Sequence, residues 1–256
     1  MTSRTSTDRP GTGRTAVVTG ASSGIGAATA RALAADGFDV VLGARRLEKC
    51  QELAEEIGGR AVRLDVTDDA SVAALAAALD RCDVLVNNAG GAKGTESVAD
   101  ADLDHWRWMY ETNVLGTLRV TRALLDTLLA SDAGLVVVIA SMAATQPYPG
   151  GAGYNAAKFG QRALTDVLRQ ETGATNLRVT RIDPGMVHTD FSLVRFDGDA
   201  ERAAKVYEGV EALSADDVAE CVRWVATRPA HVNIEAMTVY PRQQVSAQVL
   251  HRRTAD

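Results

Sequence analysis

The chain has 256 residues, 46% of them hydrophobic, which is enough to bury a large core within one domain. Its net charge of −6 offers no basic surface, so we expect neither nucleic acid nor a membrane as a partner. Residues 1–13 are rich in Ser, Thr, Arg and Gly and have no apolar segment of the secretory kind. They are predicted to be a disordered N-terminal tail that precedes a single domain over residues 14–256.

Cysteine and histidine usage gives two further expectations. The three cysteines are scattered and odd in number, which favours reduced thiols in a cytoplasmic protein over a disulfide framework. The four histidines have no metal-ligand spacing, so no metal site is predicted. These residues are Cys50, Cys82, Cys221, His105, His188, His231 and His251.

A short apolar strand and a glycine-rich turn open the domain. Residues 16–18 are apolar and partly β-branched, as in a buried parallel strand. Gly20, Gly24 and Gly26 follow, where the chain must turn and approach a ligand closely. The helix that starts at Gly24 presents unpaired backbone N–H groups at its positive end, which favours binding of a pyrophosphate. A glycine triplet also serves ordinary turns, so the later motifs must support this interpretation.

The second strand is predicted over residues 39–44, and it ends in two arginines. A carboxylate near this point would favour the ribose hydroxyl of NAD, whereas Arg45 and Arg46 suit the 2′-phosphate of NADP. NADP is therefore the predicted cofactor. The alternative is that both arginines only begin the solvated helix predicted over residues 47–57.

Polar residues follow the third and fourth predicted strands, which cover residues 60–64 and 83–86. Asp65 is either a cofactor contact or a residue that favours the start of the next helix. Asn87, Asn88, Ala89 and Gly90 place amides and a flexible turn where open α/β sheets bind ligands. Both sets of residues are therefore expected at one edge of the sheet.

The middle of the chain supplies further candidate groups. A long helical stretch over residues 102–129 contains Asn113, a poor helix former. The most apolar strand, residues 134–140, delivers Ser141 to the carboxyl edge of the sheet. The helix predicted over residues 154–172 begins with Tyr154 and Lys158, which are four residues apart and so share one face.

The last third of the chain completes an alternating pattern of strands and helices. A buried strand over residues 177–182 precedes a Pro-Gly turn, and the polar segment 189–213, with a short helix over 200–209, is a predicted lid. Residues 214–217 form a capping-box pattern before a helix that extends to residue 227, and the last strand covers 232–240. This alternation predicts an α/β fold, with a doubly wound sheet of about seven parallel strands and helices on both faces.

The motifs TGASSGIG, NNAG and YNAAK, in this order, resemble those of the short-chain dehydrogenase/reductase family across about residues 14–252. The resemblance implies a Rossmann-type fold and a catalytic set of Asn113, Ser141, Tyr154 and Lys158, with the Asn113 main chain holding a water in a proton relay. It also implies a cofactor site of Gly20, Ser22, Ser23, Gly24, Ile25, Gly26, Arg45, Arg46, Asp65, Val66, Asn88, Ala89, Gly90, Tyr154, Lys158, Pro184, Gly185, Val187 and Thr189.

The chemistry of carbonyl reduction explains why these groups belong together. A hydride must reach the carbon, and a positioned acid must give a proton to the oxygen. A tyrosine phenol keeps its proton near neutral pH, so it is a poor proton acceptor unless nearby positive charge lowers its pKa. Lys158 and an oxidised nicotinamide can supply that charge to Tyr154. Ser141 can hold the substrate oxygen in place.

Two segments, residues 191–199 and 228–234, are similar to those of NADP-dependent 3-hydroxy acid dehydrogenases, which act on serine and L-allo-threonine. A short hydroxy acid needs a cation for its carboxylate, and Arg195 is the candidate, unless it pins the lid through a structural ion pair. Met142 and Tyr148 are expected to line the same pocket together with Ser141 and Tyr154. This chain differs from the subgroup at Asp197, where a basic residue is common, and at Lys93.

Two other functions remain open at this point. One is a ketoreductase of another aldehyde, ketone or acyl thioester. The other is a nucleotide-sensing regulator without turnover, against which the complete catalytic set argues. The family also implies a homo-oligomer, a tetramer or a dimer, with long helices at the subunit faces and a C-terminal tail (243–256) that reaches a neighbour. Apolar residues at 114, 115, 118 and 125 agree with this, although they can equally face the chain's own sheet.

Overall fold

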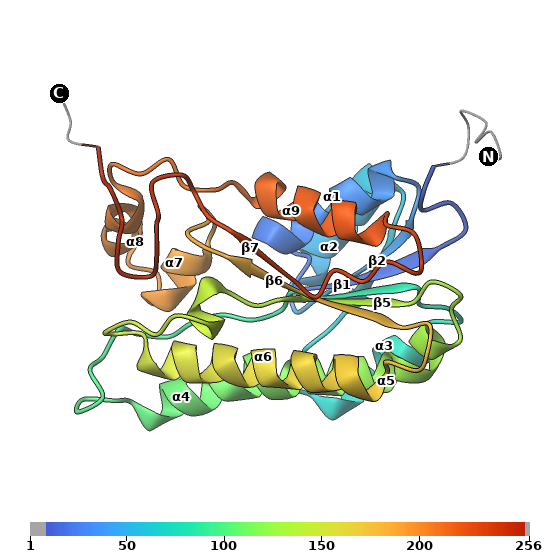
Figure 1. The fold of residues 1–256 in the computed structure, drawn as a ribbon, viewed down its shortest axis with the longest axis horizontal. Coiled ribbons are helices and arrows are strands. Elements are labelled where there is room, and N and C mark those ends of the chain that lie inside the picture. Colours follow the sequence, from blue (N-terminus) through green and yellow to red (C-terminus); the bar gives the residue numbers. More distant parts are fainter. Residues whose placement is uncertain (1–8, 254–256) are drawn as a thin grey trace.

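A computed structural model describes residues 9–253 and contains one parallel sheet with the strand order β3-β2-β1-β4-β5-β6-β7 (Figure 1). The order reverses after β3, because the chain crosses back to place β4 beside β1. All six neighbouring pairs are parallel, so every strand ends at the same edge of the sheet. The strands are β1 (Thr15–Thr19), β2 (Asp39–Ala44), β3 (Arg60–Arg63), β4 (Val84–Asn87), β5 (Leu135–Ile139), β6 (Arg178–Pro184) and β7 (Ala236–Val239).

Helices cover both faces of this sheet, each through its own apolar core. On one face α1, α2 and α9 pack against strand residues such as Val18 and Val86. On the other face α3, α5 and α6 pack against residues such as Val17 and Leu85. The helices are α1 (Gly24–Ala35), α2 (Leu47–Ile57), α3 (Asp69–Ala77), α4 (Leu103–Tyr110), α5 (Gly116–Leu129), α6 (Ala152–Glu171), α7 (Phe191–Arg195), α8 (Ala200–Tyr207) and α9 (Ala215–Ala226). The predicted doubly wound α/β fold is therefore confirmed.

Most predicted boundaries agree with the structure, and the exceptions lie near the sheet edge. The helix predicted over 102–129 runs without a break from residue 103 to residue 129. A π-helical turn, Glu111–Leu115, lies between its two α-helical parts, α4 and α5. β6 extends beyond its predicted end to Pro184, because its last residues still pair with β7. β7 itself is shorter than predicted. The lid contains a second short helix, α7, which the polar composition of the segment did not predict.

Parts of both terminal segments are described by the structure. Residues 1–8 of the predicted disordered tail lie outside the described residues, but residues 9–13 form a turn in which the Gly11 N–H donates to the Asp36 carbonyl at 2.9 Å. A Cβ at Gly11 would overlap the Phe38 ring. The C-terminal tail packs on its own chain, where the Gln244 side chain accepts a hydrogen bond from the Met186 N–H at 2.8 Å and the Ala247 N–H donates to the Gln146 side chain.

Two polar side chains join β1 to β4 at the point where the strand order reverses. The buried Thr19 hydroxyl accepts hydrogen bonds from the backbone N–H groups of Asn88 and Ala89, both at 3.0 Å, and donates to the Val86 carbonyl. The Asn88 side chain donates to the carbonyls of Thr19 and Gly20 at 2.9 and 3.3 Å. Because ligands of open α/β sheets bind at such a switch point, these bonds hold the floor of the predicted cofactor site.

Replacing Thr19 by valine tests this arrangement. Thr19→Val leaves two part-buried backbone N–H groups without their acceptor, so we expect the free energy of unfolding to fall by about 1–3 kcal/mol. Urea denaturation measures the change. The matched control is Thr29→Val in α1, where a fully buried hydroxyl has no partner among the described residues and its loss should be neutral or stabilising. Equal losses in both variants would contradict the role given to Thr19.

Candidate active site

One large cleft of about 1120 Å³ runs along the carboxyl edge of the sheet. It exceeds the usual size of a small-molecule pocket and can hold a dinucleotide together with a small substrate. All the predicted site residues line it except Gly26 and Asn113, which lie behind its wall. The tertiary structure thus brings together side chains from the ends of β1, β2, β4, β5 and β6, from α6 and from the lid.

The glycine turn forms the part of the cleft that fits a pyrophosphate. Gly20 and Gly24 have φ values of 66° and 54°, which glycine adopts without strain. Ser23 precedes α1 without capping it by its side chain, so the first-turn N–H groups of this helix remain available to an anion. A Cβ at Gly26 would come within 2.4 Å of the Gly20 carbonyl oxygen. Gly26 therefore acts by letting α1 approach the turn.

Two arginines stand beside this turn at the end of β2. The Arg46 guanidinium donates to the Ser22 hydroxyl at 3.0 Å and to the Ser23 hydroxyl at 2.7 Å. It precedes α2 without making a side-chain cap. The charge of Arg46 thus lies against the glycine turn, and Arg45 lines the same cleft.

Asp65 has a structural role in its own turn and also lines the cleft. Its carboxylate accepts hydrogen bonds from the Thr67 N–H at 3.0 Å and from the Thr67 hydroxyl at 2.7 Å, while the cap of α3 is Asp68. Burial raises the pKa of Asp65, but the Thr67 bonds and the charge of Arg45 outweigh it and leave the pKa below its usual value. A negative carboxylate is therefore held at the wall of the cleft near Arg45.

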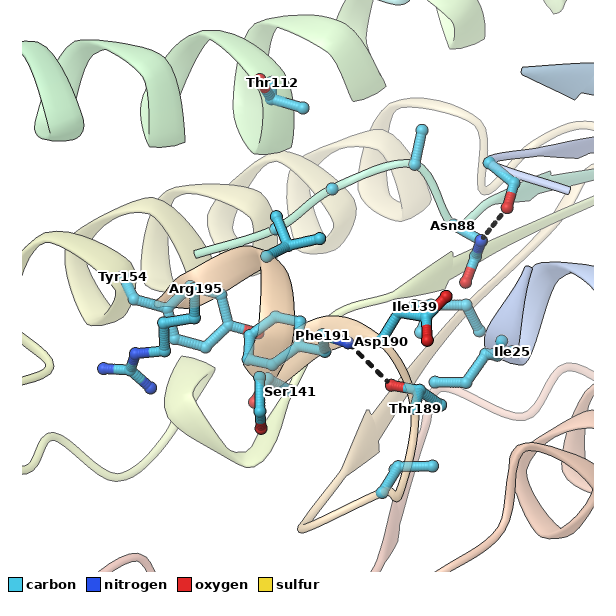
Figure 2. Close-up of a pocket in the computed structure, with 18 of the residues that line it drawn as sticks. Ile25, Asn88, Thr112, Ile139, Ser141, Tyr154, Thr189, Asp190, Phe191 and Arg195 are labelled. Carbon is cyan, nitrogen blue, oxygen red and sulfur yellow. Dashed lines mark hydrogen bonds between the residues drawn. The ribbon is translucent and has the colours of Figure 1, made fainter. Parts of the chain in front are cut away.

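Tyr154, Lys158 and Ser141 all line the cleft. Tyr154 and Lys158 lie one turn apart on the buried face of α6, and the Lys158 ammonium is 5.7 Å from the centre of the Tyr154 ring. The Ser141 hydroxyl accepts the Ala143 N–H at 3.1 Å, which leaves its own hydrogen for a second partner. Figure 2 shows Ser141 and Tyr154 at the lid end of the pocket, near Phe191 and Arg195.

The pKa shifts of this group follow from its burial. Desolvation raises the pKa of Tyr154, while a hydrogen bond with Ser141 and the charge of Arg195 act in the opposite direction. Desolvation lowers the pKa of Lys158 to about 7, although the Asp183 carboxylate counteracts it. Both shifts favour the neutral forms, so Tyr154 keeps its phenolic proton at neutral pH and burial destabilises the ammonium of Lys158.

Asn113 lies in the π-helical turn and does not reach the cleft. Its side chain donates to the carbonyls of Gly91 and Met109 at 2.9 and 2.7 Å and accepts from the Gly91 N–H at 3.2 Å. These bonds tie the helix to the segment after the NNAG motif. Isolated π turns often occur at functional sites.

The predicted lid contacts the rest of the chain through Arg195, the last residue of α7. The guanidinium donates to the Gly94 carbonyl at 3.0 Å, the Gly150 carbonyl at 3.2 Å and the Tyr148 hydroxyl at 3.3 Å. All three acceptors are neutral, and no carboxylate within residues 9–253 forms a salt bridge with Arg195. The ion pair considered as an alternative role is therefore wrong, and the positive charge of Arg195 stays uncompensated beside the Tyr154 ring, at 6.0 Å from its centre.

The two residues that depart from the subgroup pattern contact each other. Lys93, after the NNAG motif, forms an ion pair with Asp197, which follows α7. Next to it, the Gly94 N–H donates to the Arg195 carbonyl at 3.1 Å. The two charges neutralise each other, so neither departure leaves an unpaired charge. The ion pair instead joins the predicted lid to the segment after β4.

Several lining residues carry no motif and were missed by the sequence. Phe191 stacks at a tilt against Tyr154, with ring centres 5.6 Å apart. The Tyr207 hydroxyl donates to the Val187 carbonyl at 3.1 Å, and Gln244 reaches the pocket from the C-terminal tail. Their only signal is membership of the polar lid or the tail, which does not identify single residues.

Within residues 9–253, no three His, Cys, Asp or Glu side chains gather closely enough to hold a metal ion. In the same part of the chain, no helix has the length and apolar character needed to cross a bilayer.

Comparisons with known proteins agree with this geometry. The family model described as short chain dehydrogenase matches residues 14–199. An uncharacterized oxidoreductase of Mycobacterium tuberculosis is 62% identical over 91% of this chain and 93% of its own length. Serine 3-dehydrogenase of Agrobacterium fabrum is 41% identical over 90% and 94%. A solved closed form of serine dehydrogenase complexed with NADP⁺ has a TM-score of 0.88 at 39% identity, and the match covers 93% of this chain and 99% of that one.

The predicted resemblance is thus confirmed by sequence and by structure. With its seven-stranded sheet, its glycine turn and its pairing of Tyr154 with Lys158, this chain belongs to the short-chain dehydrogenase family.

Proposed function

We propose that this enzyme uses NADP to interconvert a small 3-hydroxy acid and the corresponding carbonyl compound. The observation that carries the substrate class is the uncompensated charge of Arg195 beside Tyr154. A cation placed there suits a substrate whose carboxylate lies a short distance from the reacting oxygen. The similarity to serine 3-dehydrogenase supports the same class.

NADP is the cofactor of this enzyme. Arg45 and Arg46 stand at the end of β2, and Arg46 is directed by two serine hydroxyls of the glycine turn. A guanidinium matches a phosphate group better than it matches a ribose hydroxyl. The similar serine dehydrogenase was solved with NADP⁺, which agrees with this assignment.

The roles of the side chains follow from their positions. When bound, NADPH supplies a hydride to the carbonyl carbon, and NADP⁺ accepts it in the reverse direction. Tyr154 gives its phenolic proton to the carbonyl oxygen, and Ser141 donates a hydrogen bond to the same oxygen. Lys158 stabilises the phenolate that remains, and Arg195 orients the substrate through its carboxylate. Asn113 keeps the helix and the NNAG segment in register beneath these groups.

Bulky side chains at this end of the cleft support a small substrate. Met142, Tyr148 and Phe191 line it together with Arg195. A ketoreductase of larger or uncharged carbonyl compounds is the competing function, and it differs in having no use for the Arg195 charge.

The chain is also proposed to form a homo-oligomer in the cytoplasm. Large apolar side chains are exposed on α4, α5 and α6, with exposed fractions between 38% and 62%, namely Leu103, Tyr110, Leu118, Phe159 and Val167. Of the apolar residues expected there, Leu118 faces outward, whereas Val114 is buried and Leu125 packs on the chain's own core. The three cysteines are free, as in a reducing compartment.

Tyr154→Phe tests the proton donor. It removes the acidic hydrogen while keeping the ring, so we expect kcat for NADPH-linked reduction to fall about 10²-fold to 10⁴-fold. Because burial raises the pKa of Tyr154, oxidation by the wild-type enzyme should become faster from pH 7 to pH 9 as phenolate forms. Tyr110→Phe, at an exposed tyrosine outside the cleft, is the control for the loss of a hydroxyl. Unchanged turnover in Tyr154→Phe would refute the assignment.

Arg195→Met tests the substrate class. The loss of a charged partner should raise KM about tenfold to a hundredfold for 3-hydroxyisobutyrate, while KM for its methyl ester should change less than about twofold. Steady-state kinetics with both compounds measures the difference. A rise of equal size for the acid and the ester would instead mean that Arg195 only supports the lid. Wild-type preference for the ester would favour the ketoreductase.

Light scattering tests the assembly. With a subunit mass of 27.1 kDa, we expect a particle of two or four subunits. Phe159→Glu places a charge in the exposed apolar surface of α6 and should lower the measured mass. Val98→Glu, at an apolar side chain that is more exposed and lies outside this surface, is the control. A monomeric wild-type protein would contradict the proposal.

A further inference from the structure

Lys158 is surrounded by protein groups that decide its charge. Its ammonium donates to the Ile139 carbonyl at 3.2 Å and to the side-chain oxygen of Gln161 at 2.8 Å. The charged group that faces it from the sheet is Asp183 of β6, which is itself held by Arg181. The phenol of Tyr154 faces it from α6. The Gln161 amide is thus the nearest side-chain acceptor of the ammonium.

The orientation of the Gln161 amide is determined by its neighbours. A lysine ammonium only donates hydrogen bonds, so the amide oxygen must face Lys158. The amide nitrogen then points the other way and donates to the Thr117 hydroxyl at 2.9 Å. Gln161 is fully buried and lies one turn after Lys158 on α6. A buried amide with both ends paired has one stable position.

Thr117 extends this chain of hydrogen bonds to the π-helical turn. Its hydroxyl accepts from Gln161 and donates to the Asn113 carbonyl at 2.7 Å. The bonds therefore run in one direction from Lys158 through Gln161 and Thr117 to Asn113. All four residues are buried, so the chain is shielded from bulk solvent.

We propose that Gln161 is a positioning residue that holds the Lys158 ammonium in its charged form and aims it at the reacting end of the cleft. The inference rests on the proposed roles of Tyr154 and Lys158. Burial by itself disfavours the ammonium, whereas an aligned carbonyl oxygen at 2.8 Å favours it. The link through Thr117 keeps that oxygen from turning away. Gln161 does not touch the cleft, so it acts only through Lys158.

Gln161→Met keeps the length of the side chain and removes the acceptor. The pKa of Lys158, about 7 in the structure, should then fall by about one unit. The chain has four lysines, so ¹³C-labelled lysine side chains give few NMR signals, and Lys158→Met identifies the signal of interest. The titration midpoint of that signal measures the shift without any turnover.

The same variant has a kinetic signature. For NADPH-linked reduction of malonic semialdehyde, the alkaline limb of kcat should move about one unit to lower pH, with KM for the aldehyde within about twofold. Gln161→Glu supplies a charged acceptor and should return the limb to the wild-type position or above it. The control Thr165→Val removes a buried hydroxyl of α6 that bonds only to the Gln161 backbone carbonyl, and it should leave the limb unchanged.

The outcomes separate this proposal from the proposed function. If the midpoint of Lys158 and the alkaline limb stay at their wild-type values in a folded Gln161→Met variant, the role of Gln161 is wrong, whatever the substrate. If Tyr154→Phe and Gln161→Met both turn over like the wild type, the proposed function is wrong. A shifted NMR midpoint in an enzyme that does not accept malonic semialdehyde supports the role of Gln161 and rejects only that substrate.

Discussion

The arrangement of the whole site depends on one constraint, the parallel direction of all seven strands. Parallel strands end at the same edge, so each loop that follows a strand contributes to one continuous cleft. The reversal of strand order between β1 and β4 opens that edge, and the bonds of Thr19 and Asn88 fix the distance between the two loops. For this reason one cleft is lined by the glycine turn, the arginines after β2 and Ser141 after β5.

Burial shifts the pKa values of Tyr154 and Lys158, because it destabilises the charged form of each side chain. A phenol and an ammonium taken out of water both favour their neutral forms, which raises the pKa of Tyr154 and lowers that of Lys158. The protein offsets the cost at Lys158 with oriented oxygens and with Asp183, which are fixed groups and need no rearrangement during the reaction. The π turn at Asn113 belongs to the same arrangement, because it places a backbone carbonyl where Thr117 can reach it.

The lid uses neutral and charged contacts for different purposes. Arg195 is held by carbonyls and a hydroxyl, which orient the guanidinium without neutralising it. Lys93 and Asp197 neutralise each other and therefore serve only to hold the lid against the loop after β4. The C-terminal tail adds Gln244, which binds the backbone at Met186 from the opposite side. Neutral and charged contacts thus both hold the lid segment against the rest of the chain.

Local patterns in the sequence were sufficient for the sheet, most element boundaries, the glycine turn, and the pairing of Tyr154 with Lys158 on one helical face, because each depends on short-range periodicity or spacing. The family and its cofactor followed from motifs of the same kind. Only the tertiary structure decided the neutral partners of Arg195, the pairing of Lys93 with Asp197, the course of the C-terminal tail, the turn at residues 9–13 and the chain through Gln161. Gln161 looked like an ordinary polar residue on a helix, and its partner Thr117 lies 44 positions away. Such contacts join segments that are distant in the sequence, and no local pattern records which of them meet when the chain folds.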